Sequence, residues 1–212
     1  MKLKLILFTV VLAFASMAHA QGIWSNLSIA GGAEGIFPAS TFTKAATIAN
    51  SGNGGAQDTT NSVGYVGDLR YDFGRHSAVG FSYTFNRNTE YFFSQTEVPN
   101  HIQTNNSEMI GTYIFRLPSN DRVKPFALFG GGLVRFQPNN DYITNGVPAT
   151  DTNPAFAYGF GSDFKVSDHW ALRLQYRGLI RAEPDFKLAS SGFGTSLRTH
   201  VPEPSLEVVY HF

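Results

Sequence analysis

The 212-residue sequence contains no cysteine, which excludes disulfide bonds, thiolate nucleophiles and zinc sites with sulfur ligands. Charge is also scarce, because only 15% of the residues are Asp, Glu, Lys or Arg, against about 25% in typical soluble domains. The 16 basic and 16 acidic residues cancel, which argues against a nucleic-acid binder that neutralises phosphates. The mean hydropathy of −0.13 is too polar for a bundle of membrane helices.

Aromatic residues and glycine are abundant instead. Phe, Tyr and Trp make up 14% of the chain, with 19 Phe and 9 Tyr, and there are 21 Gly. Aromatic residues favour β-strands. A chain that is rich in them but not hydrophobic on average predicts strands with one apolar and one polar face. The length suits one domain of ordinary size or two very small ones.

The first twenty residues are predicted to be a cleaved secretory signal peptide. A positive start with Lys2 and Lys4 precedes an apolar stretch, which is followed by the small residues of an A-x-A cleavage site. The apolar stretch is too short to span a bilayer as a helix, which takes about 20 residues. We expect cleavage between Ala20 and Gln21, so that the mature domain covers residues 21–212.

Apolar and polar residues alternate eight times along the mature chain. In the clearest stretch, Val63, Tyr65 and Leu69 lie on one phase, and Ser62 and Asp68 lie on the other. A period of two places the two sets on opposite faces of a strand. No stretch of comparable length shows helical spacing. The sequence therefore predicts eight strands, within residues 27–37, 62–73, 79–86, 109–117, 126–136, 156–166, 170–180 and 206–212.

Ionisable residues well inside these strands fall on the face opposite the apolar one. In the fifth strand, for example, we assign Phe126 and Phe136 to the apolar face and Arg135 to the polar face. Arg87 and Lys124 fall on the apolar phase, but at strand ends, where a membrane interface would tolerate them. The polar face carries seven basic and six acidic residues together with one histidine: Glu34, Asp68, Arg70, Asp72, Glu108, Arg116, Arg135, Asp163, Lys165, Arg173, Arg177, Arg181, Glu207 and His211.

These charges are expected to lie inside a closed barrel. A soluble eight-stranded barrel such as a lipocalin would turn its apolar face inward. Here the apolar face is rich in aromatic residues near strand ends, as in the interfacial girdles of outer-membrane barrels. Eight strands leave an interior that side chains just fill. Because unpaired ions are costly to bury, we expect a plug of salt-bridged side chains rather than an open pore.

The connections between the expected strands alternate in length. Tight turns at one end of a barrel and long loops at the other are typical of outer-membrane proteins, whereas long loops are uncommon in compact soluble domains. The short connections are predicted at residues 74–76, 118–122 and 167–168, and the long ones at residues 38–60, 89–106, 137–153 and 183–201.

Three segments resemble the small outer-membrane β-barrel domain family of the OmpA, OmpX and opacity type. They are the glycine-rich segment 123–136, the turn and strand at 166–177, and the ending with Leu206, Val208, Tyr210 and Phe212. The ending resembles the terminal-Phe signal that the barrel-assembly machinery reads. The resemblance implies an all-β, eight-stranded, antiparallel, up-and-down transmembrane barrel. It further implies a monomer in the bacterial outer membrane with both termini in the periplasm, in contact with membrane lipids and lipopolysaccharide. No peptidoglycan-binding domain follows the barrel, so a tethering role is not implied.

Residues that could carry chemistry are few. No pair of histidines has the spacing of metal ligands, so neither a metal site nor a cofactor is expected. Residues that could form a catalytic site at the rim arise easily by chance, and we do not expect an enzyme. These are His101 with Ser107 and Glu108, and His200 with Ser196 and Glu183.

The expected function is structural, with the long loops presenting a surface for interaction. Three alternatives stay open at this point. The first is a small passive channel similar to a porin, and the second is an enzyme at the extracellular rim that modifies lipid or cleaves peptides. The third is a soluble barrel that binds a ligand.

Overall fold

A computed structural model describes residues 24–42, 55–94, 100–118, 122–143, 146–188 and 198–212 of the protein. The predicted signal peptide and its cleavage site between Ala20 and Gln21 lie outside these residues. Within the described ranges, no helix is both long and apolar enough to cross a membrane. Most of the described residues belong to β-strands.

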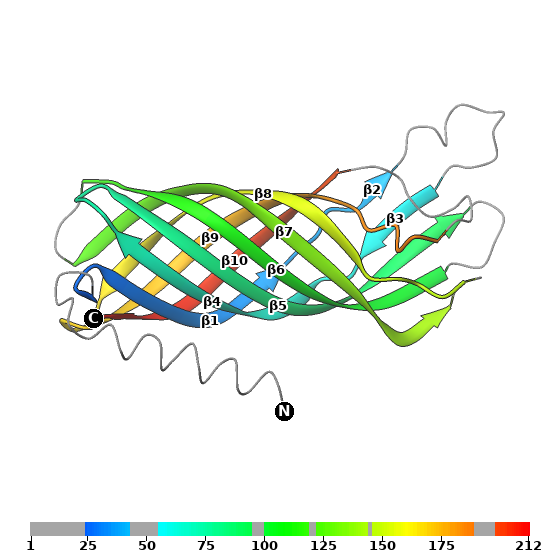
Figure 1. Ribbon diagram of the computed structural model, residues 1–212, viewed down its shortest axis with the longest axis horizontal. Helices are drawn as coiled ribbons and strands as arrows, with labels where there is room; N and C mark the ends of the chain where they lie inside the picture. The colour runs from blue at the N-terminus through cyan, green and yellow to red at the C-terminus, as the bar shows by residue number, and fades with distance from the viewer. Residues whose placement is uncertain (1–23, 43–54, 95–99, 119–121, 144–145, 189–197) are drawn as a thin grey trace.

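Eight antiparallel strands form the wall of a closed barrel, which confirms the predicted fold (Figure 1). They are β1 (Leu27–Ile36), β4 (Ser62–Asp72), β5 (Ser77–Ser94), β6 (Asn100–Arg116), β7 (Val123–Ile143), β8 (Asp151–Lys165), β9 (Trp170–Ala182) and β10 (Arg198–His211). The first and last strands pair with each other, with Gly31 opposite Val208, and this pairing closes the ring. Closure gives the backbone of every wall strand a partner on both sides, as a hydrocarbon environment demands.

The segment 38–60, which the sequence predicts to be a loop, contains two short strands, β2 (Thr41–Phe42) and β3 (Gly55–Thr59). The β4–β5 pairing extends only as far as Tyr65 opposite Phe85. Beyond that point β3 pairs with β5, with Thr59 opposite Glu90. Strand β3 therefore continues the wall beside β5 in the region that precedes the beginning of β4 (Figure 1).

Two other predicted loops are largely strand. Strands β5 and β6 pair as far as Phe92 opposite Asn100, within the predicted loop 89–106. Strand β7 continues to Ile143, within the predicted loop 137–153. These outer parts carry Asn, Gln and Thr on both faces, so the apolar alternation disappears while the ladder of backbone hydrogen bonds continues.

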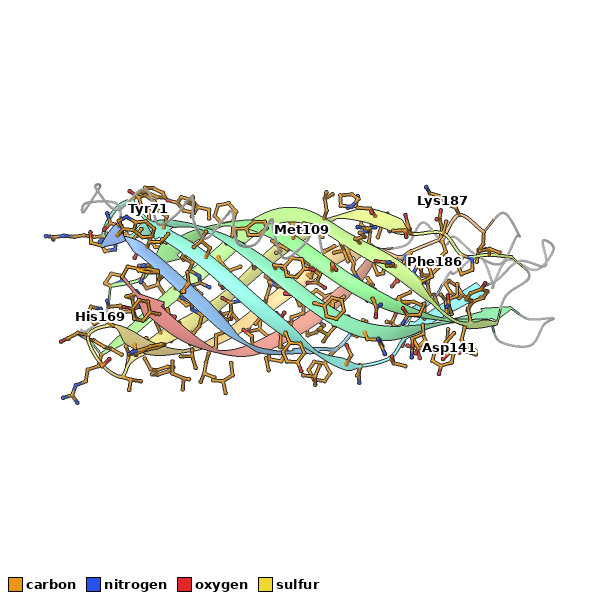
Figure 2. All side chains as sticks on the ribbon, turned by 60° about the horizontal axis from the view of Figure 1, so that its bottom comes forward. Tyr71, Met109, Asp141, His169, Phe186 and Lys187 are labelled. Atoms are coloured by element: carbon orange, nitrogen blue, oxygen red, sulfur yellow. The ribbon has the colours of Figure 1, made fainter. Side chains whose placement is uncertain are left out.

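The two ends of the barrel differ. Tight turns at residues 74–76 and 166–169 lie at one end, together with the C-terminus, and we call this the turn end (Figure 1). The outer parts of β5, β6 and β7 reach the other end, which we call the loop end. Figure 2 shows His169 at the turn end, and Asp141 and Lys187 at the loop end.

A belt of outward-facing apolar side chains surrounds the barrel. Exposed and buried residues alternate along each strand; Tyr65, for example, is 77% exposed, and the next residue, Val66, is 4% exposed. At the turn end the rings of Trp170 and Tyr210 meet with centroids 4.9 Å apart, as in an aromatic girdle. So large an apolar surface suits contact with lipid. We call these residues the apolar belt: Ile29, Val63, Tyr65, Leu69, Val79, Phe81, Tyr83, Phe85, Met109, Phe115, Phe129, Leu133, Phe156, Tyr158, Phe160, Phe164, Leu172, Leu174, Leu206 and Val208.

Strand β7 faces the opposite way from the prediction. Phe126 and Phe136 point into the barrel and are buried, whereas Phe129 and Arg135 face outward and are exposed. The assignment of Arg135 to the interior is therefore wrong. Both faces of this strand are apolar near its centre, so its periodicity cannot show which face points inward. Inside the barrel these rings stack against guanidinium groups. The guanidinium carbon of Arg70 lies 4.5 Å from the centroid of the Phe126 ring.

Arg135 is tolerated outside because it lies past the apolar belt. Its cross-strand neighbours are Ser107 and Thr152, which are polar. Arg87 of β5 also faces outward past the belt, and its Nε donates a hydrogen bond to Asn105 Oδ1 at 3.0 Å. Arg87 and Arg135 are therefore outward-facing guanidinium groups next to the apolar belt at the loop end.

Candidate functional site in the barrel interior

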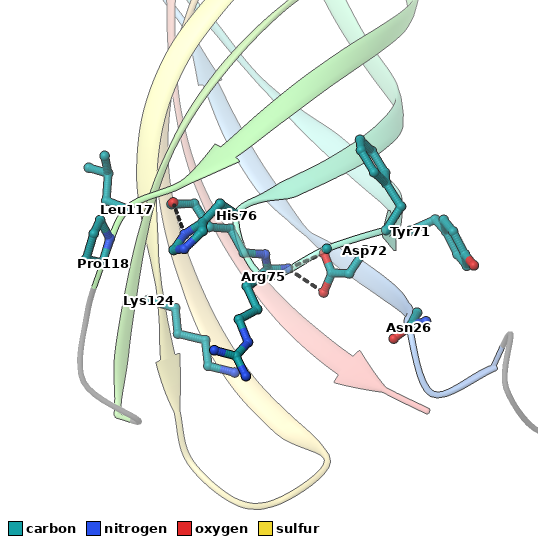
Figure 3. Close-up of a pocket in the computed structure, with 11 residues that line it drawn as sticks. Asn26, Tyr71, Asp72, Arg75, His76, Leu117, Pro118 and Lys124 are labelled. Carbon is teal, nitrogen blue, oxygen red and sulfur yellow. Dashed lines mark hydrogen bonds and ion pairs between the residues drawn. The ribbon is translucent and has the colours of Figure 1, made fainter.

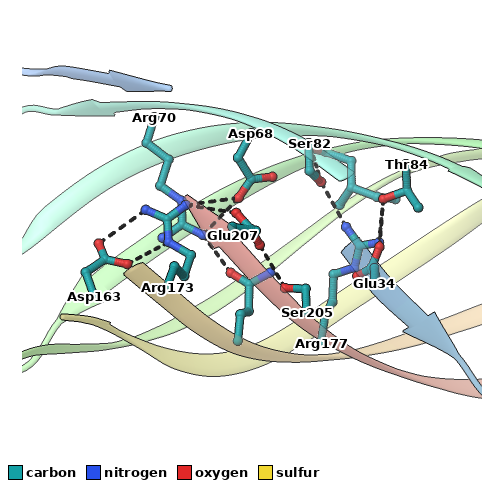
Figure 4. Close-up of polar contacts among 12 residues, drawn as sticks. Glu34, Asp68, Arg70, Ser82, Thr84, Asp163, Arg173, Arg177, Ser205 and Glu207 are labelled. Atoms are coloured by element: carbon teal, nitrogen blue, oxygen red, sulfur yellow. Dashed lines mark hydrogen bonds and ion pairs between the residues drawn. The ribbon is translucent and has the colours of Figure 1, made fainter. Parts of the chain in front are cut away.

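The first layer of interior ions surrounds Arg173 (Figure 4). Arg173 is fully buried, and its Nε and Nη2 donate to the two carboxylate oxygens of Asp163 at 2.6 and 3.2 Å. Its Nη1 donates to Asp68 and to Glu207, at 3.3 Å each. Arg70 also donates to Asp68, at 3.1 Å. Four strands of the wall, β4, β8, β9 and β10, are therefore joined by one network of charge-assisted hydrogen bonds.

The second layer surrounds Arg177, which follows Arg173 on the inward face of β9. Its Nε donates to Glu203 at 2.6 Å. Its Nη2 donates to Glu34 at 3.2 Å and to Glu108 at 2.9 Å. All four side chains of this layer are buried. One guanidinium group thus holds three carboxyl groups from three other strands.

The buried ions do not balance as the sequence predicts. Together the two layers contain three arginines and six carboxyl groups, namely Arg70, Arg173, Arg177, Glu34, Asp68, Glu108, Asp163, Glu203 and Glu207. Of the other predicted interior cations, Arg116 pairs with Asp72 at the turn end. Lys165 is exposed and pairs with Asp168 in a turn. The interior between the two ends is therefore rich in carboxyl groups.

Glu203 is a member of the second layer that the sequence analysis missed. The segment Pro202–Pro204 suggests the start of a strand rather than its interior, because proline lacks the backbone N–H. The signal was nevertheless present, because Glu203 has the same parity as Ser205 and Glu207 on the inward face of β10. Extending the alternation back through the prolines would have found it.

Above the ion layers, toward the loop end, the interior becomes apolar. A buried cluster contains Ile110, Val134, Phe136, Leu179 and Val201 with several other side chains. Arg181 stacks on this cluster, with its guanidinium carbon 4.5 Å from the centroid of Phe136. This apolar layer separates the ion layers from the loop end.

Phe186 closes the loop end. Its ring is fully buried in the same cluster, although the residue belongs to the connection after β9. Its carbonyl oxygen accepts a hydrogen bond from Ala149 N at 3.0 Å, and Asp185 N donates to Asp151 Oδ2 at 3.1 Å. Figure 2 shows Phe186 and the neighbouring Lys187 at this end of the barrel.

Two acidic residues lie beside this closure. The first is Glu90, which accepts a short hydrogen bond from Thr59 Oγ1. The second is Glu183, whose neighbour Pro184 accepts a hydrogen bond from Gln57 Nε2 at its carbonyl oxygen, at 3.4 Å. Burial, and secondarily the charge of Glu90, raises the pKa of Glu183 to about 7. Glu183 is thus a buried carboxyl group that loses its proton only as the pH approaches neutral.

Little free space is left between the ion layers. A cavity of about 10 Å³ lies beside Arg70, Ser82 and Arg177, which is room for about one water molecule. Arg177 Nη1 donates to Ser82 at 2.9 Å across this region. The interior is filled at the level of the ions.

The structure does not assemble the candidate catalytic sets. His101 lies 3.8 Å from Asp141, whereas Glu108 is buried in the barrel and Ser107 accepts a hydrogen bond from the outward-facing Tyr83 at 3.3 Å. Ser107 and Glu108 therefore lie on opposite faces of β6.

In the second candidate set, the structure does not bring His200 and Glu183 together. His200 hydrogen-bonds with the hydroxyl group of Tyr158 at 2.8 Å, whereas Glu183 is buried. Ser196 lies outside the described residues. Within the part of the chain that the structure describes, no three His, Asp or Glu side chains could together hold a metal ion.

The residues of the predicted assembly signal lie along the outer face of β10. Leu206, Val208 and Phe212 are exposed, and Tyr210 is half-buried against the Trp170 ring. This placement makes them accessible from outside the barrel. Their recognition by the assembly machinery stays a prediction.

A family model described as the outer membrane protein beta-barrel domain matches residues 6–199. No curated protein matches the sequence. Neisserial surface protein A has 14% identity and a TM-score of 0.59, with 89% of this chain and 98% of that chain covered. OprG from Pseudomonas aeruginosa has 12% identity and a TM-score of 0.60, with 90% and 97% covered. Ail from Yersinia pestis, in complex with the heparin analogue sucrose octasulfate, has 18% identity and a TM-score of 0.52, with 88% and 97% covered.

At these identities the likeness to solved structures is one of fold. The family model, in contrast, covers most of the chain. The apolar belt and the closed ring of strands agree with it. The protein therefore belongs to the outer membrane protein beta-barrel domain family and resides in the bacterial outer membrane.

Proposed function

We propose that the protein is a monomeric barrel with a closed lumen, and that its role is structural and interactive rather than that of a channel or an enzyme. One observation carries this proposal: buried side chains block the interior both in the middle and at the loop end. The Arg173 and Arg177 layers occupy the middle, and Phe186 closes the loop end. A solute would have to separate buried ion pairs and displace an apolar cluster to pass, and both steps are costly.

The barrel is proposed to stand with its turn end in the periplasm and its loop end outside the cell, as the family resemblance implies. The outward-facing Arg87 and Arg135 then lie where the apolar belt meets the outer polar region. Arg135 forms no ion pair with any residue that the structure describes. Guanidinium groups pair well with phosphate oxygens. These two residues are proposed to contact the phosphates of lipopolysaccharide.

Single-channel recording in planar bilayers tests the closed lumen. The wild-type protein should insert without steady openings, while a known porin in the same bilayers shows that the assay detects conduction. Steady and reproducible openings of the wild-type protein would overturn the proposal and favour a passive channel.

The lipopolysaccharide contact has its own test. The double variant Arg87→Gln, Arg135→Gln should retain less lipopolysaccharide after extraction in mild detergent than the wild type does. Arg122→Gln, which removes an exposed guanidinium group at the turn end, is the matched control and should retain as much as the wild type. Equal retention by all three proteins would contradict this role for the two arginines.

Lipid A mass spectra test the enzyme alternative. Expression of the protein should leave the spectra unchanged, because Glu108 and Glu183 are buried, whereas His101 lies beside Asp141 and His200 bonds to the Tyr158 hydroxyl group. Modified lipid A that disappears in His101→Ala or His200→Ala would show that the proposal is wrong.

A further inference from the structure

A cavity of about 990 Å³ opens at the turn end of the barrel (Figure 3). Its lining includes Asp72 at the end of β4, Arg75 in the following turn, Arg116 at the end of β6 and Lys124 at the start of β7. We call this cavity the turn-end mouth. Because the apolar phase of β7 is reversed from the prediction, Lys124 lies on the inward phase of that strand and not on the outward one.

The turn-end mouth is strongly cationic. Asp72 is the one carboxylate in its lining, and Arg116 Nη2 already donates to both of its oxygens, at 2.7 and 2.8 Å. Arg75 and Lys124 form no ion pair with any residue that the structure describes. In Figure 3 their side chains point into the same part of the cavity. Two like charges that converge in this way create a positive potential that attracts an anion.

Arg116 supplies a second, independent observation. Its side chain is only 12% exposed, and Asp72 occupies its Nη2. Its Nε is buried and has no hydrogen-bond partner. A buried donor is normally satisfied by protein, water or a bound group. The wall of the mouth therefore includes a fixed cation with an unused donor just below the surface, in addition to two exposed cations.

We propose that the turn-end mouth binds a phosphate group through Arg75, Lys124 and Arg116. The planar fork of arginine and the point charge of lysine are both suited to phosphate oxygens. The outward faces of the same segments carry the exposed apolar residues Phe73 and Leu117, so the mouth lies where the apolar belt ends. With the turn end in the periplasm, this is the level of inner-leaflet lipid headgroups. A phospholipid headgroup and free phosphate offer the same chemistry.

The test uses the mature protein in maltoside micelles, which contain no phosphate. One arm measures the binding of inorganic phosphate by calorimetry. The other arm adds phosphatidylglycerol and counts the retained lipids by native mass spectrometry. The double variant Arg75→Gln, Lys124→Gln should bind about tenfold or more weakly, because it loses charge-assisted hydrogen bonds. Lys187→Gln, which removes an exposed cation at the loop end, is the matched control and should bind as the wild type does.

Asp72→Asn gives a change of the opposite sign. Removing the carboxylate frees Arg116 Nη2 and raises the net charge of the mouth, so phosphate binding should become tighter. A signal in the calorimetric arm that follows these variants identifies soluble phosphate, and a signal in the lipid arm identifies a headgroup. If binding in both arms is absent or ignores the variants, the proposal is wrong.

Discussion

The ring of Phe186 meets the ring of Phe92 edge-on, with centroids 6.0 Å apart, at the loop end of the barrel. Phe186 reaches this position with a φ of 51°, and the next residue, Lys187, has a φ of 56°. A left-handed conformation at a residue with a side chain costs roughly 1–2 kcal/mol. The chain therefore accepts local strain in order to bury one aromatic ring in the mouth of the barrel.

Phe186→Ala should lower the free energy of unfolding by about 3–5 kcal/mol, the usual range for removing a fully buried phenylalanine ring. The loss arises because the space between Phe92 and the apolar cluster is left empty or floods with water. Urea unfolding from liposomes measures it. A variant as stable as the wild type would show that the ring does not pack in the mouth as the structure has it.

Lys187→Gly should have the opposite effect. Its side chain is exposed, so the substitution removes only the cost of the left-handed conformation, and glycine adopts that conformation readily. The gain should be about 1 kcal/mol in the same unfolding measurement. A loss of stability instead would mean that the Lys187 side chain contributes a contact worth more than the strain.

Glu183 should make the protein less stable as pH rises from about 4.5 to about 7. Burial, then the charges of Glu90 and Asp58, raise its pKa from 4.5 to about 7, against the opposing charge of Arg181. Between these values the folded state keeps a proton that the unfolded chain has released, so the free energy of unfolding falls with pH and levels off above the folded pKa. At about 1.4 kcal/mol per pKa unit, the fall is on the order of 3 kcal/mol.

The matched variant for this pH dependence is Glu183→Gln. It has no proton to lose, so its unfolding free energy should fall less than that of the wild type over the same range. Urea unfolding from liposomes at several pH values gives both curves. Parallel curves would assign the pH dependence to other groups.

Arg177 is expected to be the least replaceable ion of the interior. Arg177→Met leaves three buried carboxyl groups without their shared cation, and breaking such an arrangement costs about 3–5 kcal/mol. Glu108→Gln should cost much less, because Arg177 keeps Glu34 and Glu203 as partners. The two unfolding free energies should therefore differ clearly, and equal values would contradict the arrangement.

Strands β4 and β9 could be predicted from the sequence because their two faces differ in polarity. Arg173 lies between Leu172 and Leu174, and Asp68 lies next to Leu69. In a barrel surrounded by hydrocarbon, only one orientation keeps such ions out of the lipid. The same argument correctly placed the charged residues of the two ion layers inside the barrel, apart from Glu203, which it did not consider. It overestimated the number of interior cations, because Arg135 and Lys165 are exposed.

Strand β7 and the beginning of β10 could not be predicted for different reasons. In β7, Gly130 and Gly132 lie on the inward face, where a Cβ atom at either position would overlap with backbone atoms of β6, so glycine is required there. Because both faces of the strand are otherwise apolar near its centre, residue polarity does not show which face points inward. In β10, the carbonyl group of Pro202 accepts from Phe37 N at 3.1 Å, and that of His200 accepts from Ala39 N at 3.0 Å. These bonds need no N–H from proline, so the strand tolerates residues that suggest a loop.

Leu172→Arg tests the orientation of the apolar belt. Leu172 faces outward opposite Val208, two residues from the girdle residue Trp170, and an arginine on the lipid face at this depth should cost on the order of 1–2 kcal/mol, between the values for the interface and for the middle of the bilayer. Gln175→Arg, on the inward face of the same strand, should differ in cost because it acts through crowding and charge balance. Unfolding from liposomes compares the two variants. A harmless Leu172→Arg would place that side chain away from the lipid.

Deletion of Phe212 should separate the stability of the barrel from its assembly. Phe212 is exposed and follows the last wall strand, where its ring contacts Trp24 at 5.5 Å and Tyr210 at 5.1 Å between centroids. None of the interior ion pairs involves it, so the truncated chain should still fold into detergent micelles in vitro, as the different gel migration of boiled and unboiled samples would show.

In cells, loss of the terminal aromatic residue should lower the amount of barrel in the outer membrane, because the family resemblance assigns this residue to the signal that the assembly machinery reads. Phe73→Ala, which removes an exposed ring elsewhere at the turn end, is the control for a general loss of interfacial contact. Normal surface levels of the truncated protein would refute the assembly role of Phe212, and a failure to fold in vitro would assign its contribution to the barrel itself.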